Sequence, residues 1–95
     1  METFDIYVRS PFGKYKGTIS FSRDNGRVEG FLSFQIFSAD FSGAASGDDI
    51  SFKGSMETPM GKFDFDARAT IKDGRIDGSA ETRLGTMTFS SKEGR

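Results

Sequence analysis

The chain has 95 residues, 13 of them basic and 14 acidic, with 11 Phe and no Cys, His or Trp. This balanced charge gives no field that would attract nucleic acid or an anionic membrane. Without Cys or His, disulfides, thiolate metal sites and the usual general base are excluded. We therefore expect one domain over residues 1–95 that is not an enzyme and has no cofactor or metal.

Targeting features limit the expected location. The N-terminus has no basic segment followed by an apolar one, so we predict no signal peptide. No apolar stretch approaches the roughly 18 residues of a membrane-spanning helix, so we predict no membrane span. Because the absence of Cys suits a reducing compartment, we expect a cytoplasmic protein.

A short motif recurs along the chain. The sequence SPFGK at residues 10–14 returns as TPMGK at residues 58–62 and, less closely, as TRLGT at residues 82–86. An internal period of roughly 20–50 residues is typical of a repeated supersecondary unit that cannot bury its own apolar face. A period of 24 residues aligns four predicted units without gaps: residues 1–24, 25–48, 49–72 and 73–95.

Within each unit, apolar and polar residues alternate with a period of two, which indicates β-strands. In the first unit, for example, Phe4, Ile6 and Val8 alternate with Asp5 and Tyr7. A helix does not produce this contrast. Each unit is therefore predicted to be a β-hairpin with one buried face, and the recurring motif marks the turn in its middle.

A second kind of turn joins the units. Asn25-Gly26 and Asp73-Gly74 tolerate the positive φ angles of a type I′ turn, which suits a hairpin. The link at residues 46–50, SGDDI, is expected to be a looser version. Since all the connections are short, we predict a meander in which each strand lies beside the previous one.

Charged residues select the register within a hairpin. One register places Lys53 opposite Asp66 and Glu57 opposite Lys62, whereas the other register that is compatible with burial pairs like charges. The selected register also sets a Gly opposite a Phe in three units and inverts the arrangement in the first. An aromatic ring that covers a glycine is typical of strongly twisted strands.

Closure of the sheet follows from its edges. Four hairpins with one apolar face leave two exposed edges unless the sheet closes, and eight strands are enough to close it. We predict an all-β fold, an eight-stranded antiparallel up-and-down barrel in which residues 86–92 pair with residues 2–9. A two-sheet sandwich is the alternative.

The eight-stranded meander with glycine-punctuated strands resembles the small lipocalin-like and streptavidin-like barrels. The resemblance covers the whole chain at the level of the fold. The Gly-x-Trp of the first lipocalin strand and the tryptophans around a streptavidin-type biotin site are absent, since the chain has no Trp. The resemblance therefore implies a barrel, and no functional residue is carried over from it.

Small residues gather on the predicted inner face near the Asn-Gly end of the barrel. The large residues of the first unit can fill this space and give a solid core, as is usual for close-packed interiors. The alternative is a dry pocket for a small hydrophobic ligand, with Tyr15 as one of the few inner polar groups. The residues assigned to that ligand site are Tyr15, Gly43, Ala45, Ala67 and Ala69.

Apolar residues occupy the hairpin tips, where turns usually carry polar side chains. Turned inward they would plug the barrel, whereas turned outward they would form a patch for a protein partner or a second copy. The second tip, SFQIFS, lacks Pro and Gly and adds further Phe residues. The predicted patch consists of Tyr7, Phe12, Phe31, Phe34, Ile36, Phe37, Met60 and Leu84.

Other residue patterns do not favour a chemical site. Asp64 and Asp66 share one outer face, but calcium requires about six oxygens and neighbouring lysines are better partners. The outer Ser and Thr residues have no activating base. The leading hypothesis is thus a small non-enzymatic barrel that acts by contact, as an interaction or accessory module. The competing hypothesis is a binder of a small hydrophobic ligand inside the barrel.

Overall fold

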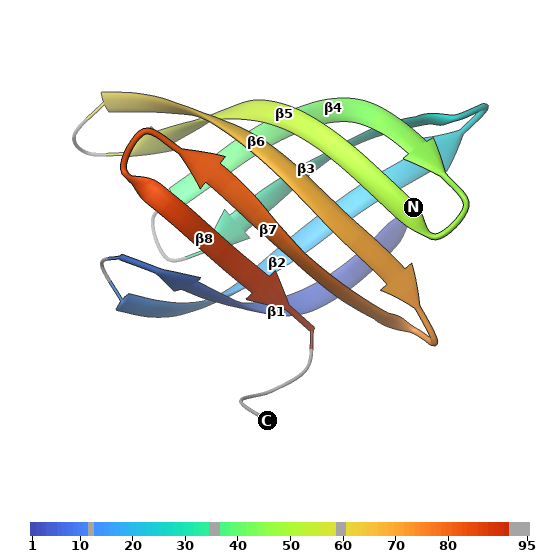
Figure 1. The fold of residues 1–95 in the computed structure, drawn as a ribbon, viewed down its shortest axis with the longest axis horizontal. Helices are drawn as coiled ribbons and strands as arrows, with labels where there is room; N and C mark the ends of the chain where they lie inside the picture. The colour runs from blue at the N-terminus through green and yellow to red at the C-terminus, as the bar shows by residue number, and fades with distance from the viewer. Residues whose placement is uncertain (12, 35–36, 59–60, 92–95) are drawn as a thin grey trace.

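The strands follow one another with short connections along the chain (Figure 1). The computed structural model describes residues 1–11, 13–34, 37–58 and 61–91. Its eight strands are β1 (Glu2–Ser10), β2 (Gly13–Asp24), β3 (Arg27–Phe34), β4 (Phe37–Ser46), β5 (Asp49–Thr58), β6 (Gly61–Lys72), β7 (Arg75–Thr82) and β8 (Gly85–Ser90). The prediction of an all-β chain is confirmed.

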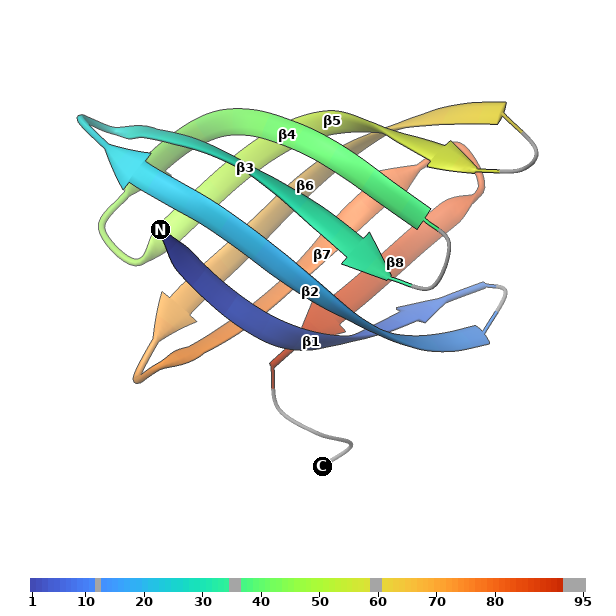
Figure 2. The same cartoon turned by 180° about the vertical axis from the view of Figure 1, so that it is seen from behind.

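Each strand pairs antiparallel with the next, and β8 pairs with β1. The sheet is a closed barrel with the order β1-β2-β3-β4-β5-β6-β7-β8. Figures 1 and 2 show this closed sheet from opposite sides, with the strands coiled strongly across one another. The predicted up-and-down barrel is therefore confirmed, and the alternative two-sheet sandwich is wrong.

The register predicted for the hairpins is also confirmed. Lys53 lies opposite Asp66 and Glu57 lies opposite Lys62. The Lys53 and Lys62 ammonium groups lie 3.7 Å and 3.6 Å from carboxylate oxygens of Asp66 and Glu57. All four hairpins share this register, although the 24-residue repeat itself stays an interpretation of the sequence.

Two glycines lie directly beneath aromatic rings, as the register predicts. Gly54 is paired with Phe65 and Gly78 with Phe89. A Cβ atom on Gly54 would meet the tip of the Phe65 ring at 2.9 Å, and one on Gly78 would meet the Phe89 ring at 2.6 Å. Because the rings occupy the space of a side chain, these positions accept only hydrogen without displacement.

The turns between hairpins have the expected backbone. Asn25 and Gly26 have φ angles of 51° and 77°, and Asp73 and Gly74 have φ angles of 54° and 74°. Positive φ at both central residues is the mark of a type I′ turn. The link between β4 and β5 is equally short, because Ser46 pairs with Asp49 and leaves a two-residue loop, but of its two central residues only Gly47 has a positive φ, 59°. It is therefore not a type I′ turn like the other two.

The seam between β1 and β8 is shorter than the sequence suggested. Residues 86–92 were expected to pair with residues 2–9, but between described residues the ladder joins only Tyr7–Arg9 to Thr88–Ser90. Beyond the ladder, Ser91 bonds to β7: its N–H donates to the Ile76 carbonyl, and its hydroxyl accepts from the Ile76 N–H, each at 2.9 Å. The last described residue of the chain thus bonds to β7 instead of extending the seam.

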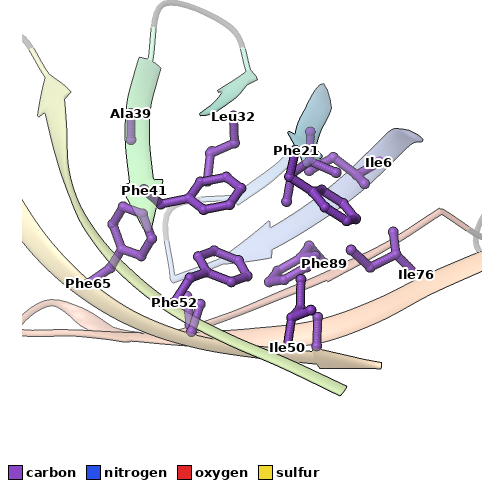
Figure 3. Packing of buried hydrophobic residues seen from close by; sticks show 14 of the residues in the cluster. Ile6, Phe21, Leu32, Ala39, Phe41, Ile50, Phe52, Phe65, Ile76 and Phe89 are labelled. Atoms are coloured by element: carbon purple, nitrogen blue, oxygen red, sulfur yellow. The ribbon is translucent and has the colours of Figure 1, made fainter. Parts of the chain in front are cut away.

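The interior is filled mainly by Phe and aliphatic side chains from all eight strands (Figure 3). Phe52 lies near the centre, with its ring centroid 4.1 Å from that of Phe41 and 6.2 Å from that of Phe65. Phe21, Phe52, Ile19, Ile76 and Val28 are the largest side chains that are completely buried. This packing is the solid core that the large residues of the first strands predicted.

Candidate contact surface

The residues assigned to an interior ligand do not converge. Tyr15 is half-buried, and its ring lies against those of Phe34 and Phe37, at centroid distances of 5.7 and 5.9 Å. Ala67 and Ala69 are buried, Ala45 is half-buried and Gly43 is exposed. The interior void described among these strands is only about 20 Å³, and Ala67 alone of the five lines it.

A void of this size holds about one water molecule, whereas ligand pockets usually measure hundreds of cubic ångströms. Ala45 and Ala69 instead line an open hollow of about 470 Å³ that mixes inner and outer residues of β4–β7. Its charged lining residues are Asp49, Arg68 and Asp77. Its hydroxyls include Thr70, which donates to Asp49 at 2.9 Å. The hollow is therefore open and carries charged and hydroxyl groups among its lining residues, unlike the dry enclosed pocket expected from the sequence.

The predicted partner patch is also divided. Phe34 is only 4% exposed and belongs to the core, so its assignment to an outward patch is wrong. Phe37 is half-buried against Phe34, at a centroid distance of 5.2 Å. Leu84 is 40% exposed at its hairpin tip. The remaining tip residues of the prediction, Phe12, Ile36 and Met60, lie outside the described residues.

Tyr7 and Phe31 do not lie side by side. The register sets Phe31 opposite Ser20 and Ser20 opposite Thr3, so Phe31 is level with Thr3, four residues from Tyr7 on β1. Four residues of strand correspond to about 13 Å. Tyr7 is half-buried and lies beneath the Lys16 ammonium, 5.8 Å from the ring centroid. The stagger between strands therefore separates the two aromatic residues that the sequence placed in one patch.

Phe31 is the exposed aromatic residue that remains at the middle of a strand, with 45% of its surface exposed. Small hydroxyl residues surround it on the outer side of the neighbouring strands. We call this surface, together with Phe31 and Asp40, the hydroxyl face. Its hydroxyl residues are Thr18, Ser20 and Ser22 on β2, Ser33 on β3, and Ser38 and Ser42 on β4.

One row of side chains crosses the hydroxyl face through Phe31. At one end, the hydroxyls of Thr3 and Ser20 are hydrogen-bonded at 3.1 Å, and Ser20 is 6% exposed. At the other end, the Ser55 hydroxyl donates to Asp64 at 2.6 Å. Between these two pairs lie Phe31 and Asp40, directly opposite each other on β3 and β4.

The outer surface of β5 and β6 is different, and we call it the charged face. Its acids are Asp49, Glu57, Asp64 and Asp66. Glu57 and Asp66 lie near the ammonium groups of Lys62 and Lys53, and Asp49 and Asp64 accept hydrogen bonds from hydroxyls. Within the described part of the chain, no group of three or more acidic residues is placed to hold a metal ion.

The side chains of the two faces can make contacts with another molecule, and the described residues there include no activated catalytic group. The hydroxyl face combines a large apolar ring with short side chains that lose little rotamer freedom when they are covered. This combination of a rigid aromatic residue and small hydroxyls is common in protein-binding surfaces. Asp40 was not among the residues singled out from the sequence, although the predicted register already places it opposite Phe31.

Comparison with known proteins adds no relative. The sequence matches no protein-family model, and no curated protein and no solved structure matches it. The fold defines the class: an eight-stranded antiparallel closed β-barrel, consistent with a lipocalin-like or streptavidin-like arrangement. The part of the chain that the structure describes contains no helix that could cross a membrane.

Proposed function

We propose that this barrel is a non-enzymatic interaction or accessory module that binds another protein surface through the hydroxyl face. The observation that carries the proposal is Phe31, which leaves 45% of its surface in solvent at the middle of β3. Single exposed apolar residues are common on soluble proteins, but aromatic anchors at the centre of an otherwise small-residue surface are the usual hot spots of protein contacts.

The surroundings of Phe31 support the same proposal. Ser and Thr side chains cost little conformational entropy when a partner covers them, whereas a surface of Lys and Glu would cost more for each residue immobilised. Depletion of charged residues at the centre, with charges at the rim, is the composition of interface cores. On the outer side, the exposed charges nearest to Phe31 are Asp40 opposite it and Glu29 two residues away on β3, and Glu29 lies 3.5 Å from Arg27.

The competing function, a hydrophobic ligand inside the barrel, has less support. The interior void among described residues is about 20 Å³, and Phe52, Phe65 and Phe89 are among the side chains that line it. Opening a cavity of ligand size would remove the packing of these rings, at a cost of about 3–5 kcal/mol for each Phe lost. The outer face is therefore the better candidate.

Site-specific photo-crosslinking tests the proposal. The photoreactive analogue p-benzoylphenylalanine would replace either Phe31 or Leu84, which have similar exposure, 45% and 40%. After illumination of each protein in an extract of its native host, we expect covalent protein adducts from position 31 in clear excess over those from position 84. Illumination of the purified chain alone shows whether the adduct is a second copy.

The outcome that would contradict the proposal is an equal adduct yield at the two positions, or no adduct from position 31. A second variant, Asp66→Asn, controls for unspecific attraction of basic proteins to the barrel. Asp66 lies on the charged face, so its loss should leave the adducts of position 31 unchanged.

A further inference from the structure

We propose that Phe31 and Asp40 together bind the guanidinium group of an arginine supplied by another protein. This assignment rests on the proposed contact function and names the chemistry at its centre. The ring of Phe31 would carry the flat face of the guanidinium, and the Asp40 carboxylate would accept its N–H groups.

The geometry begins with the cross-strand pair. Phe31 and Asp40 are directly opposite on β3 and β4, and both point to the outer side of the barrel. Side chains paired in this way have Cβ atoms about 5 Å apart. A single guanidinium is large enough to touch both, since it is planar, stacks on aromatic faces and pairs with carboxylates through two N–H groups.

Asp40 is set apart from the other acids around it. In the row through Phe31, Thr3 bonds to Ser20 and Ser55 bonds to Asp64, which occupies the polar groups on both sides. The Asp40 side chain makes no hydrogen bond or ion pair within the described structure. It is an exposed carboxylate beside an exposed ring, and the chain provides it with no cation.

The nearest cations are already engaged. Lys53, diagonal to Asp40 across β4 and β5, has its ammonium 3.7 Å from Asp66. On β3, Arg27 lies 3.5 Å from Glu29. These neighbouring cations are therefore not available to the Asp40 carboxylate beside Phe31. A positive group of another molecule would be its electrostatic complement.

The chain already uses this kind of stacking elsewhere. The Arg83 guanidinium carbon lies 4.7 Å from the ring centroid of Phe63, within the range of a cation–π contact. Phe63 is buried, so its ring is covered by the barrel as well as by the arginine. Phe31 has the same ring but no arginine above it, and it also has a carboxylate beside it.

Another protein fits better than a second copy. Arg27 is the arginine nearest to Phe31 on the same strand, four residues away. If two antiparallel β3 strands met face to face so that each Arg27 covered the other Phe31, the two-fold axis would pass through residue 29. Each Glu29 would then face its own copy, and like charges directly opposite are unfavourable.

Titration with a minimal arginine tests the inference. The probe is N-acetyl-arginine methylamide, which carries one positive charge, added to ¹⁵N-labelled protein and followed by NMR. We expect saturable amide shifts centred on Phe31 and Asp40. Asp40→Asn should weaken the apparent Kd about tenfold, because it removes the charged acceptor and keeps the shape. N-acetyl-citrulline methylamide, a neutral analogue of similar shape, should bind about tenfold more weakly as well.

The matched control is Asp64→Asn, in the same row but with its carboxylate bonded to Ser55. This variant should bind the arginine probe as the parent protein does.

Shifts that centre on the charged face, or shifts that Asp40→Asn leaves unchanged, would overturn the assignment. If position 31 forms crosslinks while the arginine probe leaves Phe31 and Asp40 untouched, the contact function stands and the arginine assignment fails. If sedimentation shows a dimer that Asp40→Asn dissociates, the arginine comes from a second copy, which overturns the assignment to another protein.

Discussion

On the charged face each of the four acidic side chains has a partner within the barrel, whereas on the hydroxyl face the Asp40 side chain has none among the described residues. Both surfaces lie on the same continuous sheet, and the row of side chains through Phe31 and Asp40 continues to Ser55 and Asp64 on the charged face. On β5 and β6, Lys53 and Lys62 lie near Asp66 and Glu57, and Ser55 and Thr70 bond to Asp64 and Asp49.

This difference shows how one sheet can present a closed and an open surface. Where charges are paired across strands, a partner would have to replace interactions that already exist, and exposed pairs of this kind contribute less than about 1 kcal/mol each to stability. Where a carboxylate and an aromatic ring are left beside each other, a partner gains contacts without displacing any. Substitutions on the two faces test whether that distinction holds.

The largest loss of stability is expected for Gly30→Ala, beneath the hydroxyl face. A Cβ atom there would overlap the backbone oxygen of Ser20 and lie 2.6 Å from the Cβ of Phe21. Since these atoms belong to the paired strand and cannot rotate away, we expect the free energy of unfolding to fall by about 3 kcal/mol. Urea denaturation followed by circular dichroism measures it.

The matched variant beneath the charged face is Gly54→Ala. There, two of the three nearest atoms belong to the tip of the Phe65 ring, which can move, although the Asp40 backbone oxygen is also too close. We expect a smaller loss than for Gly30→Ala. An equal or larger loss for Gly54→Ala would mean that the backbone beneath the charged face is packed at least as tightly as the backbone beneath the hydroxyl face.

Arg23→Ala tests the ion pair that joins the start of β1 to the end of β2. Two guanidinium nitrogens of Arg23 donate to the two carboxylate oxygens of Glu2, each at 2.7 Å, and join β2 to the first residue of β1. We expect the free energy of unfolding to fall by about 1 kcal/mol. Arg27→Ala removes a single 3.5 Å contact between highly exposed groups and should have a much smaller effect. Thermal unfolding of both variants and of the parent protein measures the difference.

Lys53→Glu tests the pairing on the charged face. It replaces an ammonium 3.7 Å from Asp66 by a second carboxylate. Repulsion between exposed groups should lower stability by about 0.5 kcal/mol at low ionic strength. Because salt screens exposed charges, the difference between variant and parent should shrink in about 1 M NaCl. A difference that is independent of salt would argue against an electrostatic origin.

Phe31→Thr has the smallest expected effect on stability and tests whether the Phe31 ring supports the fold. Thr is a good strand residue and matches the hydroxyls around it, so the free energy of unfolding should change by less than about 0.5 kcal/mol. A loss of about 2 kcal/mol or more would show that the ring supports the fold, as buried rings do. Equilibrium unfolding in urea, with Phe52→Ala as the buried counterpart, separates the two roles.

Most of the fold was predictable because the signals are local. The period of two identified the strands, Asn25-Gly26 and Asp73-Gly74 identified two turns, and opposite charges across β5 and β6 selected the register. The length of the seam was not predictable. It depends on the stagger accumulated over eight strands, which no single residue pair determines.

The contact surface was less accessible from the sequence, for two reasons. Phe34 was taken as a tip residue, although the alternation that buries Leu32 continues to Phe34 and indicates an inward side chain. Tyr7 and Phe31 occupy equivalent positions in their units, but the stagger between hairpins separates them. The outward position of an aromatic residue in the repeat identified Phe31, whereas the pairing across β3 and β4 identifies Asp40 as its neighbour.

The filled interior has a consequence for how this molecule can change over time. Since Phe52 and the side chains around it hold the barrel together from within, substitutions on the outer surface leave the main source of stability untouched. The barrel can therefore acquire, exchange or lose a recognition surface one side chain at a time while the same framework persists. A scaffold of this kind is also a practical starting point for engineering new binding specificities on its outer strands.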